Sequence, residues 1–420
     1  MLNRLAGSAK KAWVKGWLVL LQAVLFNPLA LRGWVRLLKH RVEFFGTSHW
    51  IGTMVIIDYY LKRKRARRST VLSVYLINKP HLANRYLARF QAKALSDART
   101  IFVMNRFLCR LLAPLERQLF FAGPTASFVQ HPQDYHELNA RYPLHLEEAV
   151  PASERRRARA AMARLGLPRE ARFVCVHARE AGFKARLQPS GHNTYRDIDI
   201  ANYLPAIEWL TREGFWVVRM GEATVKPLPA MARVIDYARS PLKSEDLDVL
   251  LMAGCECLLG CNSGFSQLAH LFNKRALWTN SIPLEMCPWD GLALWIPKLI
   301  FSQAEGRDLT FPEIISRGIG QYHRTQEYEA AALVPRENTP DDILAATREL
   351  LGWSRGEPGY SAEDRQAQAR FAALFPPQYK AYGTRSRICA SFMRAHADLM
   401  PMVDDGMELT AAQHPLGGAS

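Results

Sequence analysis

The sequence predicts an α/β protein with two βαβ domains facing a cleft, preceded by a basic amphipathic helix. Short apolar runs rich in β-branched residues alternate with segments of helical spacing, which is the pattern of parallel sheets covered by helices. The chain has 420 residues, more than one ordinary core holds, and 49% hydrophobic with 22% charged residues is a globular composition. Its net charge of +16 is concentrated near the N-terminus.

The first element is a basic arm, residues 1–44. Residues 1–70 hold fourteen Lys and Arg against two acidic residues, a net charge of +12. Such a segment fits an anionic surface, and the apolar residues of "WLVLLQAVLFNPLALRGWVRLL", with Trp17 and Trp34, favour a membrane over nucleic acid. The interrupted apolar run is too short to span a bilayer, so we expect it to lie in the interface. The alternative is a helix packed on its own protein with a solvated basic face.

The number of cysteines indicates the redox state of the compartment in which the protein works. Seven is an odd number for a disulfide framework, and in a chain of this size it favours reduced thiols in the cytoplasm. Cys255, Cys257 and Cys261 lie close together, but they belong to an apolar strand pattern and no second pair at zinc spacing follows. We therefore expect no metal site.

The first βαβ domain is expected over residues 45–150. Strand patterns cover 69–78 and 100–107, with a helical segment between them. We interpret "SHWIGTM" as the short glycine turn after the opening strand of this domain. A charged helix over 151–171 then links it to the second domain.

The second βαβ domain is expected over residues 172–350. Its strand patterns cover 172–180, 215–221, 233–238, 255–260 and 275–280, and its helical patterns cover 202–214, 244–254 and 263–272. Such Rossmann-like domains bind ligands at the carboxyl ends of their strands. The signals weaken beyond residue 282, although Thr339 is expected to cap a helix. C-terminal helices over 351–402 are expected to pack back across the domains, and 403–420 is a tail.

"CLLGCNSGFSQLAH", residues 257–270, places a strand, a tight turn and a helix start in succession. Asn262, Ser263 and Gly264 therefore lie at the carboxyl edge of the second sheet, where the first amides of the helix favour an anion. Gly264 would let a ligand approach the backbone, and Gln267 would add an amide. Alternatively, Asn262 and Ser263 only cap the helix.

"VCVHARE" ends the first strand of the second domain with His177 and Arg179 on the same side, by period-two alternation. The planar fork of Arg179 suits phosphate oxygens, and His177 can donate to the same group or move a proton. A structural salt bridge explains an isolated His-x-Arg equally well. Two anion-suited strand ends in one domain nevertheless favour a diphosphate site.

"FVCVHAREAGF", "HNTYRDIDIANYLPAIEWLTREGFWVVRMG" and "LLGCNSGFSQLAHLFNKRALWTNS" resemble a bacterial glycosyltransferase family of surface-polysaccharide loci. That family has the twin-Rossmann GT-B architecture and is distantly similar to the protein O-fucosyltransferases and α-1,6-fucosyltransferases. The resemblance implies contacts of His177 and Arg179 with the donor's diphosphate, and it matches the Ser-Gly turn to Ser263 and Gly264. The fucosyltransferase-like group often has Asp or Asn soon after the Arg, where this chain has "EAGFK".

The stretch that follows is the one most typical of the bacterial family, which implies a place at the donor or the cleft. Tyr195, Arg196 and Asp197 are its candidate site residues, although Tyr195 and Asp199 are alternatively caps of the next helix.

Further candidates lie at other strand ends and in the first domain. Arg219, Gly221 and, more weakly, Asn280 are candidates for contacts with the donor, or else ordinary strand-end residues. His49 and Gly52 form the expected acceptor-side loop, with His49 as a catalytic base or as a structural residue.

Together these features predict transfer of a hexosyl or deoxyhexosyl group from a nucleotide-diphosphate donor to a glycan or lipid-diphosphate-linked glycan acceptor in surface polysaccharide biosynthesis. His177, Arg179 and the helix amides would stabilise the leaving diphosphate without a metal, and no cofactor besides the donor substrate is expected. The candidate bases are His49, Glu180 and Asp197.

We expect the protein in the cytoplasm, peripherally bound to the inner face of the cytoplasmic membrane, with no nucleic-acid partner. Two other functions stay open. One is another nucleotide-sugar enzyme such as an epimerase, and the other is a non-catalytic GT-B-like glycan-assembly protein.

Overall fold

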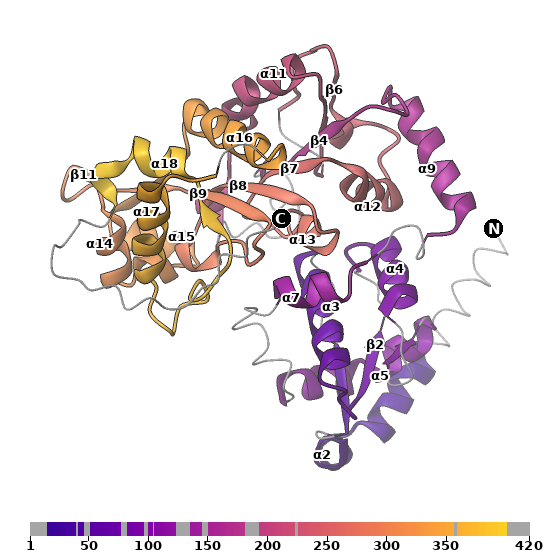
Figure 1. The fold of residues 1–420 in the computed structure, drawn as a ribbon. Coiled ribbons are helices and arrows are strands. Elements are labelled where there is room, and N and C mark those ends of the chain that lie inside the picture. The colour runs from indigo at the N-terminus through magenta and orange to yellow at the C-terminus, as the bar shows by residue number, and fades with distance from the viewer. Residues whose placement is uncertain are drawn as a thin grey trace, which may run out of the picture.

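The computed structural model describes residues 15–38, 41–45, 51–76, 82–95, 100–103, 105–122, 135–144, 150–180, 193–222, 226–356 and 359–400. These residues form a smaller N-terminal lobe and a larger C-terminal lobe, drawn below and above in Figure 1. Each lobe is built on a parallel sheet, which confirms the predicted α/β class with two βαβ units.

The N-terminal lobe has a three-stranded parallel sheet in the order β1-β2-β3. Its strands are β1 (Val42–Phe45), β2 (Leu72–Leu76) and β3 (Thr100–Val103), and its helices are α3 (Ile51–Ala66), α4 (Arg85–Leu95), α5 (Arg106–Ala122) and α7 (Tyr135–Arg141). Both predicted strand patterns are confirmed. The second strand is shorter than predicted because the Asn105 side chain caps α5, accepting from the Phe107 amide at 2.9 Å. β1 starts inside the residues assigned to the arm, so the lobe begins before residue 45.

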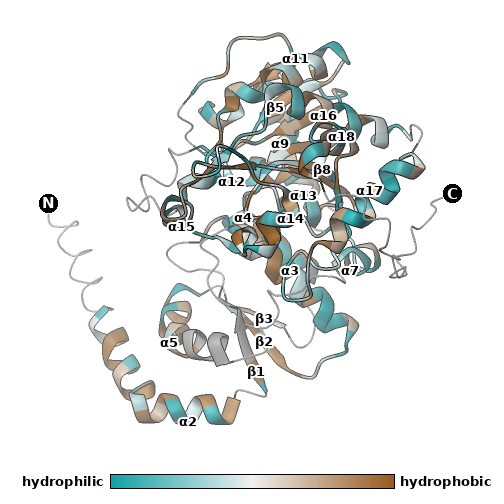
Figure 2. Ribbon diagram, turned by 90° about the vertical axis from the view of Figure 1, so that its left-hand side faces the viewer, coloured by the Kyte–Doolittle hydropathy of each residue, from teal (hydrophilic) through white to brown (hydrophobic). Residues whose placement is uncertain are grey.

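The arm forms two helices, Lys15–Leu25 and α2 (Pro28–Leu38), bent by 67°. The local sequence builds this bend. The Asn27 side chain accepts hydrogen bonds from two amides in the first turn of α2, at 3.1 and 2.9 Å. Trp34 Nε1 donates to the carbonyl of Leu25 at 3.1 Å, which satisfies the end of the preceding helix. Figure 2 shows the two helices at the outer end of the N-terminal lobe.

The C-terminal lobe has a seven-stranded parallel sheet in the order β13-β9-β8-β7-β4-β5-β6. Its strands are β4 (Phe173–Val176), β5 (Trp216–Arg219), β6 (Val234–Ile235), β7 (Cys257–Cys261), β8 (Arg275–Ser281), β9 (Ala293–Pro297) and β13 (Arg387–Ile388). The chain first builds outward from β4 to β6 and then returns to lay β7 on the other side of β4. The strand order therefore reverses between β4 and β7, and open α/β sheets bind ligands in the crevice at such a switch point.

Helices cover both faces of this sheet. On one face lie α11 (Leu204–Arg212), α16 (Pro340–Ser354) and α18 (Ala390–Ala395), and on the other lie α12 (Glu245–Gly254) and α13 (Leu268–Leu271), with the linker helix α9 (Ala152–Arg164) against α12. The expected cap at Thr339 is confirmed, because its side chain accepts from the Asp342 amide in a capping box. The predicted helix over 263–272 is reduced to α13, because residues 263–267 form turns.

The region where the sequence signals weaken folds into a small antiparallel sheet and short helices. The strands are β10 (Leu299–Ser302), β11 (Arg307–Asp308) and β12 (Leu333–Arg336), and the helices around them are α14 (Phe311–Ser316), α15 (Thr325–Ala330) and α17 (Ala362–Ala373). This lobe extension lies at the far left in Figure 1, away from the N-terminal lobe.

The two lobes share a packed interface. Helices α3 and α4 contact α13 and α12, and the rings of Phe90 and Phe272 lie 5.6 Å apart across it. At the upper end of α3, a Cβ on Gly264 would lie 2.8 Å from the amide nitrogen of Gly52. The turn after β7 therefore touches the first turn of α3, the helix that follows β1. The carboxyl edges of the two sheets meet at this contact.

A buried polar network continues along the same interface. Lys62 Nζ lies 2.9 Å from Asp58 Oδ2, both side chains being fully buried, and it donates to Asn139 Oδ1 at 2.5 Å. Asn139 Nδ2 in turn donates to the carbonyl of His270, in the C-terminal lobe, at 2.5 Å. Burial raises the pKa of Asp58, although the charge of Lys62 opposes it. The lobes are thus joined by paired polar groups as well as by apolar packing.

Candidate anion-binding site

The candidate site lies at the carboxyl edge of the seven-stranded sheet, at its switch point. His177 and Arg179 directly follow β4, and Asn262 to Gly264 directly follow β7, the strand paired with β4. Both strands are fully buried, so their apolar residues fix where the polar residues after them emerge. The structure therefore brings together the two strand ends that the sequence singled out.

Arg179 is held by hydrogen bonds to the next polar segment. Its Nη1 donates to Asp197 Oδ1 at 2.5 Å and to the carbonyl of Asn193 at 3.1 Å. The side chains of Arg179 and Asp197 are 13% and 23% exposed, so this ion pair lies at the surface of the edge and is not sealed inside it. Such a pair leaves further guanidinium donors for a ligand.

Arg196 lies beside this pair, at the end of the short helix η1 (Thr194–Arg196). Its Nη2 donates to the carbonyl and side-chain oxygens of Asn262, at 2.5 and 3.2 Å. Its Nε is buried and has no hydrogen-bond partner among the described residues. Burial and the nearby charge of Arg179 both lower the pKa of Arg196. The guanidinium of Arg196 therefore keeps one buried donor that could bind a ligand.

Lys298 is a third cation at this edge, and the sequence interpretation missed it. It directly follows β9, is buried, and donates from Nζ to the carbonyl of Asp197 at 2.9 Å. Burial lowers its pKa to about 8, against the opposing effects of the Glu337 and Asp197 carboxylates. The available signal was a Lys at the end of the apolar run "ALWIP", in a region whose strands we did not assign.

The three cations form one electrostatic group. The charge of Arg179 lowers the pKa of both Arg196 and Lys298, so both side chains are near enough to Arg179 to be opposed by its charge. Like charges gathered at low exposure are costly unless a counter-charge joins them. Asp197, paired with Arg179, already supplies one counter-charge, and a bound phosphate or diphosphate would supply more at the edge where α/β sheets bind such groups.

His177 contributes as a neutral group. Its Nδ1 lies 3.4 Å from the carbonyl of Met220, and its ring packs 5.0 Å from that of Phe265. Burial lowers the pKa of His177 to about 4. At neutral pH it therefore carries no charge for a diphosphate, and only hydrogen bonding remains open to it.

The side chains of the Asn-Ser-Gly turn hydrogen-bond to neighbouring backbone groups, which agrees with the alternative of a structural, capping role. Ser263 Oγ accepts from the Ser266 amide at 3.2 Å, and Asn262 Nδ2 donates to the Ile282 and Met286 carbonyls, so both residues hold local structure. The space next to Gly264 is taken by the backbone of Gly52. Gln267 Oε1 is buried there without a partner among the described residues.

Arg219 is a correction to the predicted set. Its side chain is 1% exposed and lies 3.0 Å from Glu180 Oε2 and 3.2 Å from Asp236 Oδ2. This arginine is committed to a buried ion-pair network, which removes it from the residues available to ribose or phosphate. The same network holds Glu180, whose side chain is 6% exposed.

Two other candidates, Asn280 and Tyr195, also have structural partners, and Gly221 has a special backbone conformation. Asn280 adopts a left-handed conformation with φ 53°, and its backbone and side chain exchange hydrogen bonds with Asn338 at 2.6 and 2.8 Å. Tyr195 is buried against Tyr328, with ring centroids 5.2 Å apart. Gly221, with φ 135°, occupies a conformation that favours glycine. These features give the three residues structural roles.

The candidate bases differ in how far the structure describes them. Asp197 and Glu180 both lie in ion pairs with arginines, as given above. His49 lies outside the described residues, while Gly52 of the same loop is at the interface. Within the described ranges, no group of three or more His, Cys, Asp or Glu side chains is arranged to hold a metal ion.

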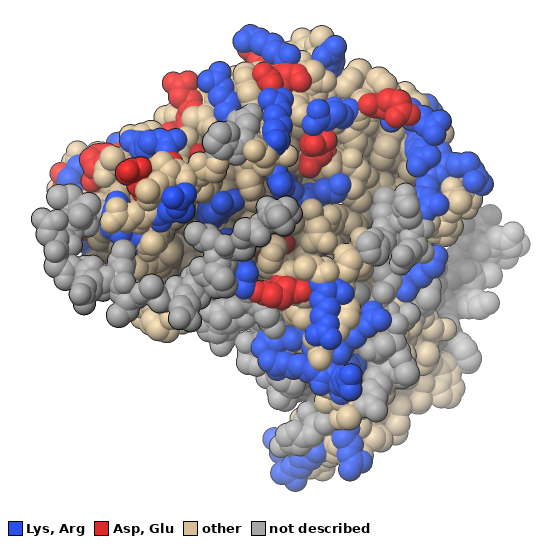
Figure 3. Space-filling view, in the orientation of Figure 1, with Lys and Arg blue, Asp and Glu red and all other residues tan. Residues whose placement is uncertain are grey.

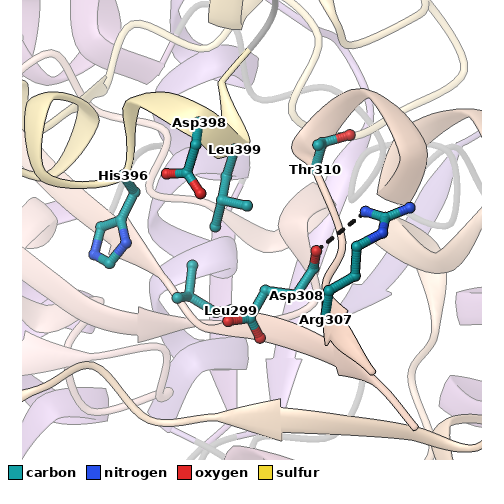
Figure 4. A pocket seen from close by; sticks show the side chains of 7 residues that line it. All are labelled: Leu299, Arg307, Asp308, Thr310, His396, Asp398 and Leu399. Carbon is teal, nitrogen blue, oxygen red and sulfur yellow. Dashed lines mark hydrogen bonds between the residues drawn. The ribbon is translucent and has the colours of Figure 1, made fainter. Parts of the chain in front are cut away.

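A separate cavity of about 400 Å³ lies between the small antiparallel sheet and the end of α18 (Figure 4). Three of its charged residues lie in ion pairs: Arg307 lies 2.7 Å from Glu313, Asp308 lies 3.2 Å from Arg336, and His396 lies 2.9 Å from Asp342. None of the three cations of the candidate site lines it.

No protein-family model matches the sequence, and no curated protein matches it. Two solved structures are similar in fold. One is the glycosyl transferase family 9 protein of Veillonella parvula DSM 2008, at 11% identity and a TM-score of 0.44, covering 74% of this chain and 97% of that chain. The other is E. coli ADP-heptose lps heptosyltransferase II, at 14% identity and a TM-score of 0.40, covering 75% of this chain and 99% of that chain.

Proposed function

We propose that this protein is a glycosyltransferase that binds a nucleotide-diphosphate sugar at the carboxyl edge of its C-terminal sheet. The observation that carries the proposal is the group of three cations, Arg179, Arg196 and Lys298, at the β4–β7 switch point. A diphosphate matches this group in charge, and the unpartnered Nε of Arg196 matches it in hydrogen bonding. The sequence resemblance implies the same role for Arg179.

In this proposal the cations act on the leaving group. Breaking the bond between the sugar and the donor leaves negative charge on a nucleoside diphosphate, and fixed positive groups stabilise that charge as it develops. Arg179 and Arg196 offer planar sets of hydrogen-bond donors, and the buried ammonium group of Lys298 adds a further positive charge. His177, being neutral, is suited to donating a hydrogen bond. The chemistry proposed for these residues needs no metal.

The acceptor is proposed to enter from the N-terminal lobe, past the start of α3 at Gly52. The contact between Gly52, in the first turn of α3, and Gly264, in the turn after β7, supports this, because it sets the start of α3 beside the donor edge. We propose a hexosyl or deoxyhexosyl donor and a glycan or lipid-linked glycan acceptor of surface polysaccharide synthesis. These finer assignments follow from the sequence resemblance.

The first test is calorimetric binding of UDP, GDP, ADP, CMP and TDP. We expect saturable binding of one diphosphate by the wild type, and at least about tenfold weaker binding by Arg196→Lys, which keeps the charge but loses the planar fork. Arg212→Gln, an exposed change on α11, is the matched control and should bind as the wild type does. Absence of binding by every nucleotide in a folded sample would overturn the donor site.

One observation favours a second candidate, a non-catalytic glycan-assembly protein. Asp197 and Glu180, two of the three predicted bases, are engaged by arginines. Release of the nucleotide from the bound donor distinguishes the two. Slow hydrolysis or transfer supports the enzyme, whereas tight donor binding without any release over hours supports the non-catalytic protein.

A further inference from the structure

The arm presents a continuous set of exposed apolar side chains. On the helix Lys15–Leu25, Trp17, Leu20 and Val24 are 48%, 55% and 63% exposed, and their spacing places them on one face. On α2, Leu29 and Leu37 are 79% and 57% exposed. Exposed apolar surface of this extent marks an interaction site.

The opposite face of the arm packs against the N-terminal lobe. Phe26, Leu31 and Val35 pack against a small core that contains Cys109 and Leu115 of α5. The arm is therefore fixed to the N-terminal lobe by one face while it presents the other outward. This fixed attachment distinguishes it from a loose tail and defines the direction in which the exposed face points.

Cations surround the same end of the lobe. Arg32 and Arg36 are exposed on α2, and Arg67 and Arg68 are exposed just beyond α3. The two groups are neighbours because the amide of Leu72, which opens β2, donates to the carbonyl of Arg41 at 2.8 Å, between α2 and β1. Figure 3 shows Lys and Arg gathered at the lower end of the N-terminal lobe.

We propose that the arm and the end of α3 form a docking surface for an anionic phospholipid bilayer. Apolar side chains would enter the acyl boundary and Trp17 would settle at the headgroup level, while Arg32, Arg36 and Arg67 bind headgroup phosphates. Charge complementarity and the two interfacial tryptophans of the arm select lipid as the occupant. The inference stands apart from the donor site, because it involves none of its residues.

The helix geometry favours lying on the bilayer over crossing it. No single helix in the described part of the chain is long and apolar enough to span, and the pair that passes by length and composition is bent by 67°. The bend is built in by the Asn27 cap and the Trp34 hydrogen bond. Straightening it would break both, so the two helices are suited to rest along a surface.

The test is co-sedimentation of the full chain with vesicles of phosphatidylcholine alone or with 30% phosphatidylglycerol, about the anionic content that favours basic surfaces. We expect binding to the anionic vesicles only. The triple variant Arg32→Gln/Arg36→Gln/Arg67→Gln should bind at least about tenfold more weakly. The matched control, Arg156→Gln/Arg157→Gln/Arg159→Gln, removes the same charge from exposed positions of α9 and should bind as the wild type does.

A second variant tests the apolar contribution. Leu20→Ser/Val24→Ser changes two exposed residues, so the fold should persist by circular dichroism while vesicle binding falls at least about fivefold. Equal loss in the α9 control, or unchanged binding in both arm variants, would overturn the proposal. Vesicle-bound protein that resists extraction by both high salt and alkaline carbonate would also overturn it, because the bent pair would then be inserted across the bilayer.

Discussion

The backbones of Gly52 and Gly264 touch across the two lobes. A Cβ on Gly264 would lie 2.8 Å from the Gly52 amide nitrogen, and a Cβ on Gly52 would lie 3.0 Å from the Gly264 Cα. Neither neighbour is the end of a flexible side chain, so neither can move aside cheaply. The contact leaves no room for a side chain at Gly264, whereas a Cβ on Gly52 would need its neighbour to shift by a few tenths of an ångström.

Gly264→Ala should therefore separate the lobes at this point. We expect a loss of about 1–3 kcal/mol in the free energy of unfolding, which is the usual cost of overpacking. Chemical denaturation measures it. Gly254→Ala is the control, because its Cβ would meet Phe173 at an ordinary 3.5 Å, and it should cost little. Equal stability of Gly264→Ala and the wild type would contradict the contact.

Lys62→Met should be strongly destabilising because it leaves the Asp58 carboxyl buried without its cation. We expect a loss of about 3–5 kcal/mol, the range for removing one partner of a buried ion pair. The double variant Asp58→Leu/Lys62→Met should recover much of that loss, since it removes both charges. A double-mutant cycle from urea unfolding gives the coupling. Additive losses would show that the pair does not act as a unit.

The His136–Asp290 pair should make stability depend on pH. His136 Nδ1 of α7 lies 2.8 Å from Asp290 Oδ1 in the C-terminal lobe, and this hydrogen bond raises the pKa of His136 in the folded protein. The stabilisation is fully present below the unfolded pKa of about 6.5 and is lost as the pH rises through the higher folded value. The melting temperature of the wild type should therefore fall relative to His136→Gln as the pH rises above about 6.5. Parallel curves for the two proteins would contradict the pair.

Diphosphate affinity should depend on the charge of Lys298. Because burial lowers its pKa to about 8, the side chain loses its charge as the pH rises through that value. We expect the dissociation constant of the bound diphosphate to increase between about pH 7.5 and 9.5 in the wild type. Lys298→Arg keeps its charge over this range and should show a flat profile. A flat wild-type profile would separate Lys298 from the site.

The second sheet was predictable because its strands are short, apolar and bounded by turn residues. Strand direction alone predicts that His177, Arg179 and the Asn-Ser-Gly turn lie at one edge of the sheet, because the carboxyl ends of parallel strands lie at the same edge. The predicted role of a residue was wrong where its local sequence pattern is compatible with more than one contact. The turn residue Gly264 suggested the close approach of a ligand, whereas the long-range packing of α3 places the backbone of Gly52 there.

Lys298 and Arg219 show that the sequence alone does not reveal which charged side chains are free to bind a ligand. Lys298 was missed because the connection from β8 to β9 carries weak local signals, so the strand before it was not assigned. Arg219 was over-assigned because a strand-end arginine looks available in sequence, whereas Glu180 and Asp236 enclose it in space. Pairing between distant segments decides which charges remain for a ligand.

Helix α3 connects the interface with the C-terminal lobe to the basic outer end of the N-terminal lobe. It starts at the Gly52 contact and ends beside the basic residues proposed to meet lipid, and its 16 residues span about 24 Å. If the proposed docking surface rests on a bilayer, α3 would separate the donor edge from the headgroups by at most that length. The protein would then act at a distance set by a rigid spacer, and an acceptor anchored in the lipid would need several sugar units below the one that reacts.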